Sequence, residues 1–168
     1  MNIDHVIRIA DLNARYADAI DADRLETWPD FFLDDGRYRI TTAENVAQGL
    51  PLSIIYATSR AMLRDRVRAL REANVYEGQR YRHVLGTPLI TAPSLPSPAS
   101  GGGWGGGGLR ARTSFMVARV MRTGDTTLFA TGCYEDRVTL DTPDGARFVE
   151  KTVILDSRQV DTLLAIPL

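Results

Sequence analysis

The first twenty residues carry apolar side chains at intervals of three and four positions. The members of this set are Val6, Ile9, Leu12, Tyr16, Ala19 and Ile20. Such spacing places them on one face of an amphipathic helix. The pattern therefore predicts a helix over residues 2–20 that packs one face against a core.

Two further helices are predicted in the first half of the chain. Residues 23–26 have the order of a capping box and would start a short helix. That helix would bury four large side chains, Leu25, Trp28, Phe31 and Phe32. Ser59 would cap the other helix, which reaches about Glu72 and turns Leu63, Val67 and Leu70 inward. Between the two, residues 34–36 predict a turn and residues 37–42 alternate as a strand.

The second half of the chain has the pattern of a sheet. Strands are predicted over five segments, residues 80–91, 113–122, 126–134, 138–140 and 147–155. A short polar connection with Gly, residues 123–125, joins the second and third segments, and another with Pro and Gly, residues 141–145, joins the fourth and fifth. Helices followed by a meander of strands predict an α+β fold, in which a curved, mostly antiparallel sheet wraps around the first helices.

One predicted strand is apolar on both faces. Phe115, Val117 and Met121 share one face, and Met116, Ala118 and Val120 share the other. A sheet with one face in water carries polar residues on that face. We therefore expect the second face to be covered by the chain itself or by another subunit, and a repeated heterologous contact would close a ring.

The last six residues of the sequence are all apolar. Exposing them to water would cost roughly 25 cal/mol per Å² of apolar surface. We expect four of them to be largely buried, against the sheet or at a subunit contact: Leu163, Leu164, Ile166 and Leu168. Deleting the six residues should weaken assembly.

Length and composition indicate one ordinary globular domain over residues 1–168. Residues 94–108 depart from this composition, because Pro, Ser and seven Gly surround Trp104. This low-complexity stretch predicts a flexible loop within the domain.

Charge and targeting signals narrow the function. The net charge of −1 gives no electrostatic reason to expect nucleic-acid or membrane binding. The first residues lack the basic and apolar regions of a signal peptide, and no apolar run is long enough for a membrane span. The single Cys133 excludes an internal disulfide and fits a reducing compartment, so we expect a cytoplasmic protein.

Few side chains could hold a metal through nitrogen or sulfur. One Cys and two His cannot build an iron–sulfur centre or a zinc site of four Cys/His ligands. An iron site of two His and one carboxylate would need both His5 and His83. We therefore expect no cofactor-binding or metal-binding residues on this chain.

Several side chains allow two interpretations. His83 lies on a predicted strand and is either a general base or, as we favour, a hydrogen-bonded structural group. Four residues could line an acid–base pocket with it, Tyr16, Asp18, Asp21 and Asp34, although acidic residues at helix ends are usually caps. Cys133 fits a buried small apolar residue better than a nucleophile.

An arginine-rich stretch before residue 72 also has two interpretations. Its members are Arg60, Arg64, Arg66, Arg68 and Arg71. Acidic residues are interspersed with them, which favours a solvated helix face with weak ion pairs. Contact with another subunit is the second interpretation, because arginine is enriched at interfaces.

Two levels of resemblance to known proteins appear in the chain. Residues 19–36, with Trp28 before Phe31-Phe32, resemble the cone-shaped fold of nuclear transport factor 2 and ketosteroid isomerase-like proteins. Three further blocks, residues 62–74, 81–88 and 155–168, resemble the small (β) subunit of Rieske non-haem iron aromatic-ring-hydroxylating dioxygenases. The similarity is greatest to the branch that acts on aromatic carboxylates such as terephthalate, with salicylate-type and anthranilate-type enzymes as neighbours.

This resemblance implies a non-catalytic structural subunit. In that family the large (α) subunit carries a Rieske [2Fe–2S] cluster and a mononuclear Fe(II), and the β subunit carries neither. The β subunits form a trimer within an α3β3 hexamer, which receives electrons from NAD(P)H through a reductase and dihydroxylates the ring with O₂.

Two other functions stay open at this point. The first is a stand-alone isomerase or dehydratase of the same cone fold, which needs an open cavity where His83 meets a carboxylate. A cone filled by aromatic side chains would count against it. The second is a simple binding module with a different partner.

Overall fold

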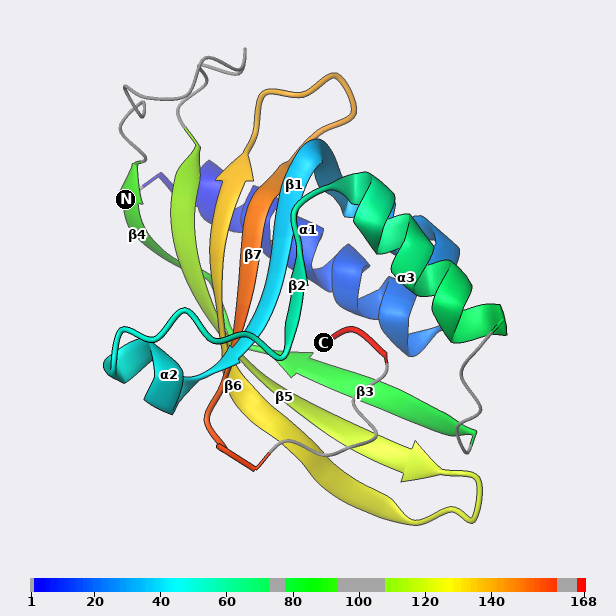
Figure 1. The fold of residues 1–168 in the computed structure, drawn as a ribbon. Coiled ribbons are helices and arrows are strands. Elements are labelled where there is room, and N and C mark those ends of the chain that lie inside the picture. Colours follow the sequence, from blue (N-terminus) through cyan, green and yellow to red (C-terminus); the bar gives the residue numbers. More distant parts are fainter. Residues whose placement is uncertain (1, 73–77, 94–107, 160–165) are drawn as a thin grey trace.

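The computed structural model describes residues 2–72, 78–93, 108–159 and 166–168. Its helices are α1 (Ile3–Asp21), the 3-10 helix η1 (Leu25–Phe31), α2 (Ala43–Ala47) and α3 (Arg60–Glu72). Its strands are β1 (Phe32–Thr42), β2 (Ile55–Ala57), β3 (Gln79–Leu85), β4 (Leu89–Pro93), β5 (Leu109–Met121), β6 (Thr126–Thr139) and β7 (Arg147–Leu155). The strands form a single bent sheet, and α1 and α3 lie inside the bend (Figure 1).

The sheet is mixed. The strand order is β2-β1-β7-β6-β5-β3, and β4 also pairs with β5. β1 runs parallel to β7, and the remaining pairs are antiparallel. This architecture of helices against one curved sheet confirms the predicted α+β fold.

The sheet bends where strand β5 changes partners. β3 pairs with β5 as far as Leu85 opposite Phe115, and β4 pairs with β5 from Leu89 opposite Arg112. The prediction of one strand over residues 80–91 is therefore wrong: the chain leaves the ladder at Gly86, whose amide donates to the Ser114 carbonyl at 2.8 Å. Residues 126–134 and 138–140, expected as two strands, instead belong largely to the one long strand β6.

Helix α1 forms as its periodicity predicts. The Asn2 side chain accepts a hydrogen bond from the Asp4 amide at 3.1 Å and caps the first turn. Its buried face consists of Val6, Ile9, Leu12, Asn13, Tyr16, Ala17, Ala19 and Ile20. Asn13 is the polar exception on this face. None of the helices in the part of the chain described here is long and apolar enough to cross a membrane.

The connection from α1 to η1 differs from the predicted capping box. Asp23 adopts a positive φ of 55°, and Arg24 takes the N-cap position without a side-chain cap. The Asp23 carboxylate instead binds Arg71 of α3, and the segment that follows winds as a 3-10 helix. Long-range charge pairing has therefore displaced the local cap.

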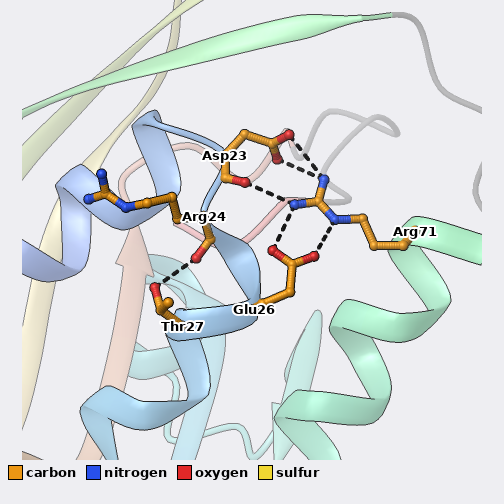
Figure 2. A network of polar contacts seen from close by, with 5 residues as sticks. All are labelled: Asp23, Arg24, Glu26, Thr27 and Arg71. Carbon is orange, nitrogen blue, oxygen red and sulfur yellow. Dashed lines mark hydrogen bonds and ion pairs between the residues drawn. The ribbon is translucent and has the colours of Figure 1, made fainter.

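Arg71 joins α3 to this connection, because two edges of its guanidinium group bind Glu26 and Asp23, as Figure 2 shows. Its Nε and Nη2 donate to the Glu26 carboxylate at 2.7 and 3.1 Å. Its Nη1 donates to both Asp23 carboxylate oxygens at 2.9 and 3.0 Å, and Nη2 also reaches the Asp23 carbonyl at 2.9 Å. The Arg71 hydrogen bonds hold the pKa of Glu26 below its usual value.

Other arginines of α3 form pairs of the same kind. Arg60 binds Asp34, and Arg64 lies 3.3 Å from Asp30. Intramolecular ion pairing, the favoured interpretation of this arginine-rich face, is therefore observed for these side chains and for Arg71.

Replacing Arg71 by alanine is expected to lower the free energy of unfolding by about 1–2 kcal/mol. The carboxylates of Glu26 and Asp23 would both lose their hydrogen bonds to a guanidinium group that is only partly exposed. Urea unfolding followed by circular dichroism measures the change. Arg68→Ala is the matched control, since Arg68 is exposed on the same helix and makes no hydrogen bond or ion pair with another described residue. Equal unfolding midpoints for the two variants would contradict this assignment.

The end of the chain turns back into the bend of the sheet. Ile166 is 6% exposed and Leu168 is fully buried, which confirms the prediction for these two residues. Leu163 and Leu164, predicted to be buried with them, lie outside the described residues, as do residues 94–107 of the predicted Gly-rich loop.

The outer face of the sheet carries exposed apolar side chains. Val84 and Met116 are direct cross-strand neighbours and are 55% and 46% exposed. Leu128 on β6 is also exposed. The described part of this chain leaves these side chains uncovered, so the covering that the sequence predicts for the second face would have to come from elsewhere.

Candidate functional site

Aromatic rings fill the inside of the bend. Six of them are fully buried: Tyr16, Trp28, Phe32, Tyr38, Tyr134 and Phe148. They meet mostly edge to face, as in the pairs Trp28–Tyr38 and Tyr16–Phe148 with centroids 5.0 and 5.5 Å apart. An acid–base enzyme of the cone type would need open space in this region, and the rings occupy it.

His83 and Asp21 are the two proposed acid–base residues that the fold brings together. His83 Nδ1 lies 2.6 Å from one Asp21 carboxylate oxygen, and the His83 main-chain amide donates to the other at 2.9 Å. The His83 side chain is fully buried, and that of Asp21 is 6% exposed. The pair ties β3 to the last residue of α1, as expected for a structural histidine.

The other members of the proposed pocket lie apart from this pair. Asp18 is exposed and binds Arg24 at 2.5 Å, and Asp34 is exposed and binds Arg60. The Tyr16 hydroxyl donates to the main-chain oxygen of Leu168 at 2.6 Å. The structure therefore does not assemble the five residues into one acid–base site.

A buried lysine occupies the middle of the core, and sequence reasoning missed it. Lys151 and Asp136 are cross-strand partners on β7 and β6, and both side chains are fully buried. Lys151 Nζ donates to the two Asp136 carboxylate oxygens at 3.2 and 3.1 Å and to Asn13 Oδ1 at 3.0 Å. Asn13 in turn donates to the Thr113 hydroxyl at 3.2 Å, so the network joins α1 to three strands.

Three aromatic rings complete the surroundings of Lys151. Its Nζ lies 3.6, 4.4 and 4.6 Å from the ring centroids of Tyr134, Phe148 and Tyr16. Cation–π attraction favours the charged amine there. Burial nevertheless lowers the pKa of Lys151 to about 8, and burial raises the pKa of Asp136 despite its partner. A cation enclosed by its partners in this way serves to hold the core together.

The outer face of the sheet has a polar hollow with a volume of about 380 Å³. The charged side chains that line it are Arg110, Arg112, Glu135, Arg137 and Glu150. Arg112 pairs with Glu135 across the strands at 2.5 Å. Opposite charges thus alternate across the hollow, which suits a polar surface better than a pocket for a single ion.

The described residues contain no cluster of three or more His, Cys, Asp and Glu side chains that could hold a metal. Cys133 lies on β6, on the same outward face of the strand as Glu135. Its side chain is half-buried, and so it is less buried than the sequence predicted. Burial raises the pKa of its thiol, which lowers its reactivity.

Comparison with known proteins shows similarity over nearly the whole chain. Residues 4–152 match the family of SnoaL-like domains. The chain is 47% identical over 163 residues to "Terephthalate 1,2-dioxygenase, terminal oxygenase component subunit beta 1" from Comamonas sp, covering 96% of this chain and 97% of the relative. It is 38% identical over 157 residues to the anthranilate 1,2-dioxygenase small subunit from Burkholderia cepacia, covering 94% of this chain and 90% of the relative.

A solved structure extends this similarity to the fold. A β subunit assigned to an aromatic-ring-hydroxylating dioxygenase from Novosphingobium aromaticivorans superposes with a TM-score of 0.82 at 35% identity, covering 99% of this chain and 100% of that one. These relatives favour a dioxygenase subunit over a stand-alone isomerase, in agreement with the filled interior. The chain has a SnoaL-like domain and belongs to the family of small (β) subunits of aromatic-ring-hydroxylating dioxygenases, which are oxidoreductases.

Proposed function

We propose that this chain is the structural subunit of an α3β3 dioxygenase in which all of the redox chemistry takes place on the large subunit. A Rieske [2Fe–2S] cluster and a mononuclear Fe(II) would then belong to the partner. The observation that carries the proposal is the end-to-end similarity to dioxygenase β subunits in a chain whose interior is packed with aromatic rings. We propose no catalytic, cofactor-binding or metal-binding residue on this chain itself.

The proposed reaction is dihydroxylation of an aromatic carboxylate with O₂, in the cytoplasm. The names of two relatives support this class, because terephthalate and anthranilate are both benzene rings that carry a carboxylate. Terephthalate is the first substrate to test, given the 47% identity to that relative. Electrons would reach the large subunit from NAD(P)H through a reductase.

Exposed apolar surface supports assembly with other subunits. One strip runs along the segment before and within β2, with Val46, Leu50, Leu52, Ile54 and Tyr56 all at least 38% exposed. The outer face of the sheet adds Val84, Met116 and Leu128. Contiguous apolar surface on a folded protein commonly marks an interaction site.

Native mass spectrometry of the chain co-expressed with a dioxygenase large subunit from the same organism tests the proposed stoichiometry. We expect a complex that contains three copies of each chain. A chain that stays separate from the large subunit would contradict the proposal and favour a binding module with another partner. A complex that contains the two chains in equal numbers other than three would leave the family assignment intact and overturn the hexamer.

A further inference from the structure

The alternation of charge across the hollow on the outer face of the sheet breaks at one place. Arg110 on β5 and Arg137 on β6 both line the hollow, and they are direct cross-strand partners. Like charges in directly opposite positions destabilise an antiparallel pair of strands. Neither guanidinium group forms a hydrogen bond or an ion pair with another described residue. Two positive charges therefore lie side by side here at a cost to the fold.

The carboxylates around the hollow do not neutralise this pair of arginines. Glu135 is already engaged by Arg112 at 2.5 Å. Glu150 on β7 is the other cross-strand partner of Arg137, but the two side chains form no ion pair. The Arg137 Nε is buried and has no hydrogen-bond partner among the described residues. Since three arginines and two glutamates line the hollow, its surface has a surplus of positive charge that an anion from outside the described chain would compensate.

Exposed apolar side chains border the hollow on both sides. Leu89 on β4 lies directly opposite Arg112 and is more than half exposed. Toward the other edge of the sheet, the lining residue Thr152 has Arg39 of β1 as its neighbour. Tyr56 of β2 lies opposite Arg39 and is also more than half exposed. Arginines together with exposed apolar and aromatic side chains are typical of a surface that binds another protein, whereas a small anion would make no use of the apolar border.

We propose that the outer face of the sheet around Arg110 and Arg137 docks an acidic side chain of the large subunit. This inference rests on the proposed function, which supplies the large subunit as the partner. A carboxylate between the two guanidinium groups would relieve their repulsion and accept hydrogen bonds that are now unmade. A symmetric contact with a second copy of this chain is disfavoured, because it would bring together two faces with the same surplus charge.

The variant Arg110→Glu tests the proposal, because its effects on the isolated chain and on the complex should have opposite signs. In the isolated chain the new carboxylate would lie opposite Arg137, so the urea unfolding midpoint should equal or exceed that of the wild type. In the complex it would repel the partner's carboxylate. When both chains are co-expressed in equal amounts with the large subunit, intact-mass spectrometry of the purified complex should find the variant at least about tenfold less often than the wild type.

Arg68→Glu is the matched control, because it reverses the charge of an exposed arginine on α3, which lies inside the bend of the sheet (Figure 1). It should enter the complex as often as the wild type. Arg110→Gln removes the charge without reversing it, so it replaces Arg110→Glu if that variant does not fold, and its share should also fall.

Equal shares of the Arg110 variants and the wild type in the complex would overturn the inference and leave the proposed function intact. A large subunit that takes up neither chain would contradict the proposed function, and the inference with it. Sedimentation velocity of the isolated chains should show unchanged self-association of Arg110→Glu. A loss of self-association would overturn the choice of partner and assign this face to a second copy of the chain.

Discussion

Replacing Lys151 by methionine is expected to lower the free energy of unfolding by about 3–5 kcal/mol, the usual loss when one member of a buried ion pair is removed. Methionine fills a similar volume, so the loss comes from charge and hydrogen bonding. Asp136 would lose its two hydrogen bonds from Nζ and remain fully buried, and Asn13 would lose one. Urea unfolding at pH 7 measures the change.

The double variant Lys151→Met with Asp136→Val is the matched control. It removes both charges, so at least half of the lost stability should return. Asn13 Oδ1 still lacks its former donor in this variant, which explains an incomplete recovery. A double variant as unstable as Lys151→Met would show that packing, and not the unpaired carboxylate, causes the loss.

The same pair predicts a pH dependence. The pKa of Lys151 is lowered from 10.5 to about 8 in the folded chain, so the unfolded chain binds more protons between these two values. Stability therefore gains a contribution from Lys151 as the pH rises from 8 to 10.5, by at most about 1.4 kcal/mol per pH unit. The difference in unfolding free energy between the wild type and Lys151→Met should widen over this range, and a constant difference would contradict the assigned shift.

Replacing Gly132 by alanine is expected to cost about 3–5 kcal/mol or to prevent folding. A Cβ at this position would overlap the main-chain oxygen of Ile154 on β7 and lie 3.0 Å from its carbonyl carbon. Phe115 Cε1 would be 3.1 Å away on the adjacent strand. Main-chain atoms cannot move aside as a side chain can, so β6 and β7 would have to separate.

Thermal unfolding measures the effect of Gly132→Ala, with Gly78→Ala as the matched control. A Cβ at Gly78 meets no atom of the described residues within 4 Å, and its φ lies outside the positive range. The control should stay within about 0.5 kcal/mol of the wild type. If the two variants unfolded at the same temperature, the close approach of β6 and β7 at this position would be wrong.

Local patterns predicted most elements of this fold. The periodicity of residues 2–20 closely matches α1, and the predicted strand 147–155 has the bounds of β7. In both elements, the spacing of apolar side chains within the segment is enough to predict which side chains are buried. The buried apolar residues of η1 were also identified, because Leu25 and Trp28 belong to the core wherever the helix begins.

Features that depend on distant partners were not predictable in the same way. Asp23 has the sequence of a helix cap, but Arg71 of α3 competes for its carboxylate. The break at Gly86 follows from the exchange of partners along β5, which no local pattern records. Strand β2 is three residues long and exists only as an addition to β1.

The candidate site shows the same limit. Sequence reasoning selected His83 and Asp21 as two of five possible partners, but their contact depends on how β3 lies against the end of α1. Lys151 gave no signal, because a lysine at an alternate strand position usually faces water. The register that places it opposite Asp136, and under the rings of Tyr134 and Tyr16, is set by the pairing of β6 with β7.

The most direct test of a purely structural role compares two complexes with the same large subunit, one containing the wild-type chain and one containing Asp21→Asn with His83→Asn. We expect both complexes to assemble and to dihydroxylate the aromatic substrate at rates within twofold of each other per assembled complex. Loss of a general acid or base typically costs about 10²–10⁴-fold in rate. A variant complex that assembles normally but loses turnover to that extent would contradict the structural role.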